Sequence, residues 1–269
     1  MNLGLNLFRT RLRAELNARQ VTVRLEQGLR GRPLGEPVEL ALAPPEAGAP
    51  RWQNAVEALA GALRDRAWSR ADLHVVVGDE NMRYAMLPAS EGVLAPGEAQ
   101  ALAAAVMQRT FGDRLEDWTL RVADCGGRRL LAAAIDRALL SALEAVAAGA
   151  QCRLRTVTPA FAGLLEQHRR AAGADTWFVA LEPAAAVVAL IEHSELRALR
   201  LRRSPIASGA ELGELLERER ARSGTELRAV AMSGVAPAGL TLPEAWSVRD
   251  LGAPDTAGMP RAGATLGLA

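Results

Sequence analysis

Residues 176–204 read TWFVALEPAAAVVALIEHSELRALRLRRS, and this stretch decides the fold prediction. The run TWFVALEP predicts one strand, and two further runs on either side of the turn HSE at 193–195 predict a second and a third. A charged helix over 211–222 follows, and then strands in LRAVAMSG and WSVRDLG. The stretch therefore opens a unit that begins with a hairpin and continues as alternating helix and strand.

The earlier part of the chain repeats this order. Alternation within RAELNARQVTVRL at 13–25 predicts a strand around Val21, Val23 and Leu25, and a second strand over 38–42 completes an opening hairpin. A helix over 52–66 and the continuous apolar run DLHVVVG at 72–78 come next, and the apolar run is typical of a strand buried on both faces. Both parts thus predict an α/β protein with two related sheets.

The segment from about 80 to 135 interrupts the first unit. It contains a strand in MRYAMLP, a helix over 95–111, and the runs WTLRVAD and RRLLAAAI around a Gly-Gly turn at 126–127. A helix over 136–148, the strand RLRTVTP and a helix over 160–172 then close the unit. We therefore predict two domains, residues 1–172 with an inserted subdomain at about 80–135, and residues 173–269.

Composition excludes several functions. The 269 residues carry 32 Lys or Arg against 31 Asp or Glu, a net charge of +1, which is too balanced for a protein that grips nucleic acid. Every basic residue is Arg, so phosphate-anchoring lysines and Schiff-base mechanisms are excluded. Ser208 is outside any GxSxG motif, so nucleophilic catalysis is not expected.

The rare side chains predict neither a metal site nor a disulfide. Cys125 and Cys152 are 27 positions apart, which favours two reduced thiols, and the three histidines are not spaced as ligand pairs. Arginines interrupt the apolar start, and no run reaches the roughly 20 residues that span a bilayer. We expect a protein that is neither exported nor membrane-spanning.

Three segments resemble the actin-like ATPase superfamily, and within it PilM of type IV pilus assembly and the cytoplasmic domain of GspL of type II secretion. HVVVGDENMRYAMLPASEGVLAPGEAQALAAAVMQRTFGD is similar to the entry into that family's inserted subdomain. WTLRVADCGGRRLLAAAIDRALLSALEAVAAGAQCRLRTVTPAF and FVALEPAAAVVALIEHSELRALRLRRSPIASGAELGELL are similar to the segments that close the first domain and open the second. The resemblance covers about residues 14 to 252. It implies an actin-like, ribonuclease H-like two-domain fold with an inserted subdomain and a shortened second domain.

The resemblance also implies a nucleotide site, whose motifs are degenerate here. Two hairpin loops of the pattern DxGxxxx(K/T) hold the phosphates in the superfamily. The corresponding segments here are ELNARQVT and LEPAAAVV, and the adenine-side turn is reduced to SGV. A Cβ at a glycine position obstructs close phosphate approach. The implied positions are Glu15, Asn17, Thr22, Glu182, Ala184, Ser233 and Gly234. We expect no ATP hydrolysis and no resident cofactor, with ATP and Mg²⁺ as the alternative.

Partner binding is the function that the resemblance favours. Arg83, Tyr84 and Met86 lie on a strand that ends before a proline, and Arg and Tyr are enriched at interfaces. In PilM a groove beside this strand receives the cytoplasmic tail of an inner-membrane partner, so a PilN-like tail and other pilus or secretion components are the expected partners. Self-association is left open. The expected location is cytoplasmic and peripheral at the inner membrane.

Two alternatives accompany this hypothesis. One is a working ATPase of the same superfamily that acts as an assembly switch, and it requires metal-dependent nucleotide binding. The other is an unrelated α/β protein that binds a small ligand, since a fold does not determine a function. A structure without the duplicated sheet and the inserted subdomain would favour the second alternative.

Overall fold

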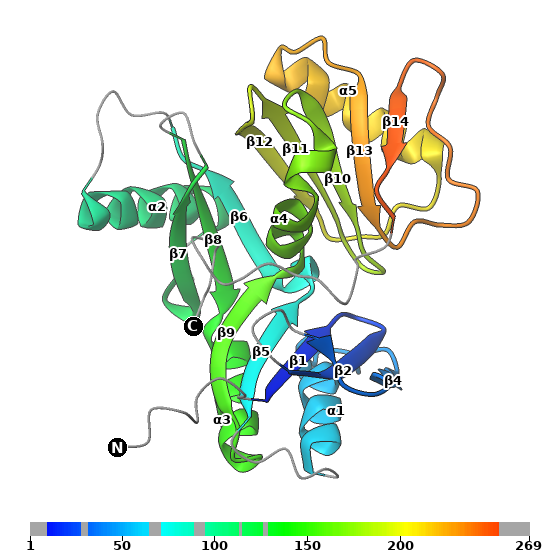
Figure 1. Cartoon of the computed structure of the whole chain (residues 1–269). Coiled ribbons are helices and arrows are strands. Elements are labelled where there is room, and N and C mark those ends of the chain that lie inside the picture. The colour runs from blue at the N-terminus through cyan, green and yellow to red at the C-terminus, as the bar shows by residue number, and fades with distance from the viewer. Residues whose placement is uncertain are drawn as a thin grey trace, which may run out of the picture.

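The structure is a computed structural model that describes residues 10–27, 32–64, 71–88, 95–112, 115–125 and 129–252. The predicted Gly-Gly turn at 126–127 lies outside the described residues. Figure 1 shows two sheets, one above the other, with a smaller third sheet to one side.

The first sheet has the strand order β3-β2-β1-β5-β9, and β4 also pairs with β2. The central strand β1 pairs antiparallel with β2 and parallel with β5, and β5 pairs parallel with β9. The strands are β1 (Arg11–Leu16), β2 (Gln20–Gln27), β3 (Arg32–Pro33), β4 (Val38–Ala41), β5 (Asp72–Val77) and β9 (Arg153–Pro159). The predicted hairpin between the strand around Val21 and the strand over 38–42 is present as the antiparallel β2–β4 pair. The prediction missed β1, which precedes β2 and pairs with it across the turn at Asn17.

Helices α1 (Gln53–Arg64) and α3 (Arg137–Gly149) pack against the first sheet. In α1 the buried side chains of Val56, Leu59 and Leu63 recur at helical spacing, which places them on one face. Burial of these apolar faces between helix and sheet stabilises the first half of the molecule.

The second sheet repeats the first. Its order is β12-β11-β10-β13-β14, with antiparallel pairing of β10 to β11 and of β11 to β12 and parallel pairing of β10 to β13 and of β13 to β14. The strands are β10 (Thr176–Leu181), β11 (Ala186–Glu192), β12 (Glu195–Arg202), β13 (Ala229–Gly234) and β14 (Ser247–Asp250). The two related sheets predicted from the sequence are thus confirmed.

Helix α4 (Ala160–Ala172) lies between the two sheets and contacts β5, β9, β10 and β13. Strand β10 is buried on both faces. Phe178 belongs to the core that includes α4, whereas Trp177 and Val179 face the core beneath α5 (Gly209–Ser223). This double burial explains why β10 is a continuous apolar run instead of an alternating one.

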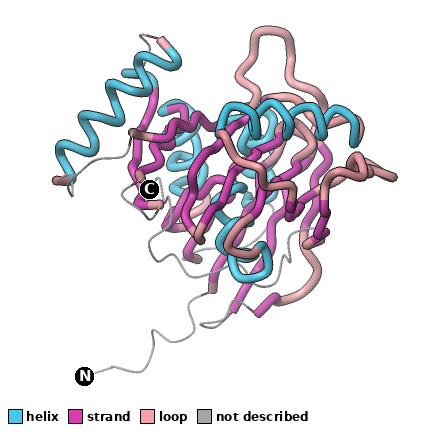
Figure 2. Tube along the Cα trace, turned by 90° about the horizontal axis from the view of Figure 1, so that it is seen from above, coloured by secondary structure: helices cyan, strands magenta, loops and turns pink. Residues whose placement is uncertain are grey.

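The inserted segment forms a third sheet of order β6-β8-β7 that is covered by α2. In the view from above, α2 lies at the far left, apart from the other helices (Figure 2). The elements are β6 (Met82–Met86), α2 (Pro96–Phe111), β7 (Trp118–Asp124) and β8 (Leu130–Asp136). The chain leaves the first sheet at the end of β5 and returns to it through α3.

The second half is simpler than the first. Strands β13 and β14 are parallel, yet the described connection at 235–246 contains no helix. Trp246, at its end, fills part of the core beneath α5. Parallel strands are usually joined through a helix, so this short connection leaves the second half smaller.

Candidate functional site

The two turns that resemble phosphate loops approach one short segment, Gly78–Glu80, from opposite sheets. The amide of Gly78 donates to the carbonyl of Leu16, immediately before the first turn, at 2.7 Å. The amide of Asp79 donates to the carboxylate of Glu182, in the second turn, at 3.1 Å. The ends of β1, β5 and β10 therefore meet where the two halves of the molecule join.

The first turn is closed by its own side chain. Asn17 Oδ1 accepts hydrogen bonds from the amides of Arg19 and Gln20 at 2.9 and 3.0 Å. The amide of Asn17 donates in turn to the carbonyl of Gln20 at 3.1 Å. The backbone amides that a phosphate would need are thus already paired.

Glu15 and Thr22 lie within the hairpin, before and after the turn. They are directly opposite each other in the β1–β2 register. Glu15 Oε1 pairs with Arg13 Nε at 2.9 Å, and Thr22 is buried and accepts from Gln20 at 3.3 Å. Both predicted site residues are therefore engaged in contacts within the sheet.

The second turn is short and tight. The amide of Glu182 donates to the carbonyl of Ala185 at 2.9 Å, so β10 passes directly into β11. Ala184 is half-buried within this turn. A glycine at the Ala184 position would leave more room for a phosphate, as the sequence analysis expected.

Ser233 and Gly234 lie beside the second turn, at the end of the neighbouring strand. Gly234 has φ +108°, and a Cβ on it would come within 2.1 Å of the Leu181 carbonyl oxygen. Ser233 Oγ donates to the carbonyl of Gly252 at 3.0 Å. The structure thus brings these two residues next to Glu182 but pairs the Ser233 hydroxyl with backbone.

Three carboxyl groups gather where the two turns meet, and the sequence analysis identified only Glu182. Asp79 is fully buried, and it accepts from Tyr84 Oη at 2.5 Å and from the amide of Phe161 at 2.8 Å. Glu80 is buried, and its carboxylate lies over Gly78. The position of Asp79 and Glu80 at the carboxyl end of a buried parallel strand was the signal that could have found them.

Burial controls the protonation of this cluster. Loss of hydration raises the pKa of Asp79, and the hydrogen bonds from Glu182, Tyr84 and Phe161 only partly offset it. Burial, together with the negative charge of Asp79, raises the pKa of Glu182 well above its ordinary value. Burial also raises the pKa of Glu80 to about 7. The cluster therefore holds protons under conditions in which surface carboxyl groups have lost them.

The three predicted partner-binding residues on β6 have different surroundings. Tyr84 is buried, its ring packs edge-on against Phe161 at 6.2 Å between centroids, and a contact between Tyr84 and a partner stays a prediction. Met86 is half-buried against the main core. The guanidinium carbon of Arg83 lies 3.9 Å from the centroid of the Trp118 ring, beside a shallow pocket. Arg83 alone keeps access to a surface hollow.

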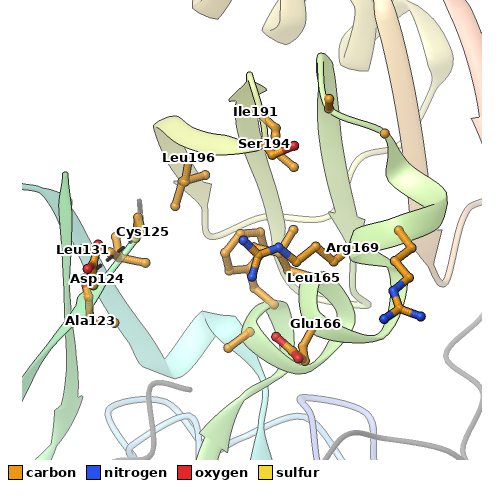
Figure 3. A pocket seen from close by; sticks show the side chains of 15 residues that line it. Ala123, Asp124, Cys125, Leu131, Leu165, Glu166, Arg169, Ile191, Ser194 and Leu196 are labelled. Carbon is orange, nitrogen blue, oxygen red and sulfur yellow. Dashed lines mark hydrogen bonds between the residues drawn. The ribbon is translucent and has the colours of Figure 1, made fainter. Parts of the chain in front are cut away.

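A larger pocket lies between the inserted sheet, α4 and the β11–β12 hairpin, with a volume of about 650 Å³. Figure 3 shows side chains from these three elements around one space. The larger apolar side chains of the lining are Leu131, Phe161, Leu165, Ile191 and Leu196. The charged lining comprises Asp124, Glu166, Arg169 and Arg170. An apolar floor with charged groups around it suits an amphipathic peptide better than a nucleotide.

Other chemistry receives no geometric support in the described part of the chain. There, no three His, Cys, Asp or Glu side chains are placed so that they could hold a metal ion. Cys125 and Cys152 are free thiols, and burial raises the pKa of Cys125 to about 11, which keeps it protonated. No helix in the described ranges is sufficiently long and apolar to cross a bilayer.

Comparisons by sequence find no relatives, since no family model matches and the search of curated proteins finds no match. Comparisons by structure do. The chain is similar to a protein of unknown function with an actin-like ATPase fold from Bacteroides thetaiotaomicron, with a TM-score of 0.60 and 9% identity over 86% of this chain and 84% of that one.

Two further solved structures are similar over most of both chains. The cytoplasmic domain of EpsL, an inner-membrane component of the type II secretion system of Vibrio cholerae, has a TM-score of 0.59 and 12% identity over 90% of this chain and 88% of that one. The PilM–PilN type IV pilus biogenesis complex has a TM-score of 0.61 and 15% identity over 89% of this chain and 90% of that one. These likenesses confirm the resemblance seen in the sequence at the level of the fold: the chain has the actin-like ATPase fold.

Proposed function

We propose that this protein is a scaffold at the cytoplasmic face of an inner-membrane assembly of the type IV pilus or type II secretion kind. It binds the cytoplasmic tail of a PilN-like partner that crosses the membrane once, and it does so without hydrolysing ATP. The similarity in fold to the PilM–PilN complex and to the EpsL cytoplasmic domain supports this proposal. Further components of the assembly would bind other faces of the same body.

The proposal depends on one observation. The two turns that correspond to phosphate loops are already hydrogen-bonded to groups of the protein itself. Asn17 uses the amides of the first turn, and each hydrogen bond lost on opening costs about 1 kcal/mol. A triphosphate would also bring its negative charges next to the acids Asp79, Glu80 and Glu182, which supply no positive charge and whose raised pKa values a bound anion would raise further. With no lysine in the chain to compensate, these contacts favour a protein that keeps the fold without the nucleotide.

The pocket between the inserted sheet and α4 is the proposed docking groove. Its floor of Leu131, Leu165 and Leu196 suits the apolar side chains of a peptide tail. Arg169 is exposed at the edge of the groove, where its guanidinium can donate hydrogen bonds to a carboxylate or carbonyl group of the peptide. This groove replaces the strand around Tyr84 as the expected contact surface.

Calorimetric titration of the purified protein with ATP and Mg²⁺ tests the absence of a nucleotide site. We expect no heat at millimolar ligand, and the same result with a non-hydrolysable analogue. Micromolar binding would instead favour the alternative, a nucleotide-binding ATPase that acts as an assembly switch.

Photocrosslinking in the native cells tests the docking groove. A benzophenone amino acid at Arg169 is compared with the same amino acid at Arg218, an exposed position on α5. We expect the Arg169 position alone to crosslink the cytoplasmic segment of a protein with a single transmembrane helix, identified by mass spectrometry. Equal crosslinking from both positions, or only to proteins without a membrane segment, would contradict the proposal.

A further inference from the structure

The first sheet has one apolar face and one polar face. Leu12 and Ala14 of β1 belong to the main hydrophobic core. Helices α1 and α3 contact each other and pack on this apolar face, and Figure 1 shows α3 behind β9. Successive side chains of a strand point to opposite faces, so Arg11 and Arg13 point away from these two helices.

A row of basic and hydrogen-bonding side chains crosses the polar face. In the strand register, Arg13 lies directly opposite Arg24 of β2 and His74 of β5. His74 Nδ1 lies 3.0 Å from Thr156 Oγ1 on β9. Two arginines placed directly opposite each other on paired strands repel, so this row favours an anionic group above it.

Arg13 supplies a positive charge that is only partly paired. Its side chain is 9% exposed, and its Nε lies 2.9 Å from Glu15 Oε1. Its Nη2 is buried and has no hydrogen-bond partner within the described part of the chain. An arginine keeps its charge when it is buried, and salt screens that charge less than the charge of an exposed side chain. Arg13 therefore makes the surface above it more positive.

The acids on the polar face do not cancel its arginines. Asp72 is buried and pairs with Arg155 Nε at 3.3 Å. Glu26 lies directly opposite Arg11 in the register. Arg153, at the start of β9, is exposed. Arginines are thus in excess over acids near the starts of β1, β5 and β9.

An apolar segment precedes β1 at this same end of the sheet. The amide of Asp72 donates to the Thr10 carbonyl at 3.1 Å, and the amide of Arg153 donates to the Ala71 carbonyl at 2.9 Å. The starts of β1, β5 and β9 therefore lie side by side. Residues 1–9, which lie outside the described ranges, read MNLGLNLFR. Leucine and phenylalanine next to arginines are typical of segments that bind the surface of an anionic membrane.

We propose that the polar face of the first sheet, near the starts of β1, β5 and β9, binds the surface of an anionic phospholipid bilayer. Arg11, Arg24 and Arg153 contact the headgroup phosphates, and residues 1–9 add apolar contact with the interface. A bilayer fits better than an acidic protein because it accepts both the charge and the apolar side chains. This inference goes beyond the proposed function, since it concerns lipid and requires no protein partner.

Cosedimentation with vesicles tests this inference on the full chain alone. Vesicles of phosphatidylcholine are compared with vesicles of phosphatidylcholine and phosphatidylglycerol in equal parts. We expect binding to the anionic vesicles only, and weaker binding as salt is added, because salt screens exposed charges. No binding to the anionic vesicles at low salt, or equal binding to both kinds, would overturn the proposal. Either result would leave the docking of a peptide tail between the inserted sheet and α4 unaffected.

Two double variants locate the contact. Arg24→Gln with Arg153→Gln should lower the partition coefficient for anionic vesicles more than about tenfold, since each arginine near the surface adds to the attraction. Arg109→Gln with Arg218→Gln removes the same charge from exposed positions on α2 and α5 and should lower it less than about twofold. Equal losses in the two variants would show that net charge alone matters and would contradict the assignment of this face.

The apolar part of the contact has its own variant. Leu7→Ser with Phe8→Ser should weaken binding at low and at high salt, because the burial of apolar side chains does not depend on charge screening. Unfolding in urea, measured on all three variants, establishes that each is folded. Unchanged binding in the Leu7→Ser, Phe8→Ser variant would refute the contact of residues 1–9 with the bilayer.

Discussion

Gly234 shows how one residue fixes the junction between two parallel strands. Its φ of +108° lies in the region that favours glycine, and Val235 donates to the Leu181 carbonyl at 2.8 Å, which draws the two strand ends together. Any Cβ at position 234 would meet that carbonyl oxygen at 2.1 Å. The glycine in the degenerate adenine-side turn is thus required by the fold, whether or not a ligand binds.

We expect Gly234→Ala to lower the free energy of unfolding by about 2 kcal/mol or more, because backbone strain and a steric clash add. Urea denaturation measures the change. Gly61→Ala is the matched control, since Gly61 lies inside α1 with open space around its Cβ position and should gain about 0.5 to 1 kcal/mol. Equal effects in the two variants would refute this explanation.

The first hairpin consists of β1, which hydrophobic periodicity did not predict, and β2, which it did. Its turn is set by Asn17, whose side chain caps two amides, and the strands on either side pair over six residues from Arg11 to Leu16. Alternation predicted the strand around Val21, Val23 and Leu25, which is β2, but not β1, because a side-chain cap leaves no trace in hydrophobic periodicity. A residue that favours turns was the available signal.

Asn17→Ala should destabilise the protein by about 1 kcal/mol, since two turn amides lose their side-chain acceptor. Chemical denaturation gives the magnitude, and hydrogen exchange of the Arg19 and Gln20 amides gives the location. Faster exchange confined to these two amides is the expected pattern. Unchanged exchange there would show that the cap contributes nothing.

The N-cap residue of helix α3, Asp136, accepts two hydrogen bonds from different parts of the chain. Asp136 accepts from the Ala138 amide at 2.8 Å and from Trp52 Nε1 at 3.2 Å, which links the start of α3 to the residue before α1. Ser208 caps α5 through the Glu211 amide alone, at 3.2 Å. The two caps therefore permit a direct comparison.

Asp136→Ala should cost about 2 kcal/mol of unfolding free energy, because it removes the cap and leaves Trp52 without its acceptor. Ser208→Ala should cost about 1 kcal/mol. The difference between the variants, measured by thermal or urea unfolding, isolates the link to Trp52. Equal losses would mean that the tryptophan hydrogen bond has no net effect.

In the molecule as a whole, two sets of carboxyl groups make the stability of the folded state depend on pH in opposite directions. Asp79, Glu80 and Glu182 have raised pKa values in the folded state, so the folded state binds more protons than the unfolded chain and stability falls as pH rises. Hydrogen bonds from backbone and arginine lower the pKa of Glu211, and hydrogen bonds from two arginines lower that of Glu217. Their contribution is lost as pH falls below about 4.5.

The free energy of unfolding should therefore decline between about pH 4.5 and pH 7, the window set by Glu80. Glu80→Gln should flatten this decline and gain on the order of 3 kcal/mol at neutral pH relative to the parent chain. Denaturation curves at a series of pH values provide the test. Stability that rises through the same window in both proteins would contradict the assignment.

The repeated order of strands and helices in the two halves could be predicted because it depends on local sequence patterns. Apolar runs, turn residues and helical spacing are each decided within a few neighbouring residues, and they recur in the same order in 11–172 and 176–250. The interruption of the first unit at about 80–135 was also predicted, whereas the strand order came only from the structure. The structure places Glu182 and Gly234 next to each other, because the adjacent parallel strands β10 and β13 end at the same edge.

What the sequence by itself determined is thus the succession of strands and helices, the absence of lysine and the loss of the phosphate-loop glycines. Only the tertiary structure decided which acids lie together and which aromatic ring is buried. Asp79 and Glu182 are 103 residues apart, and Tyr84 reaches Asp79 only because β6 leaves the sheet beside α4. Such contacts depend on how whole elements pack, and no periodicity within either segment records that packing.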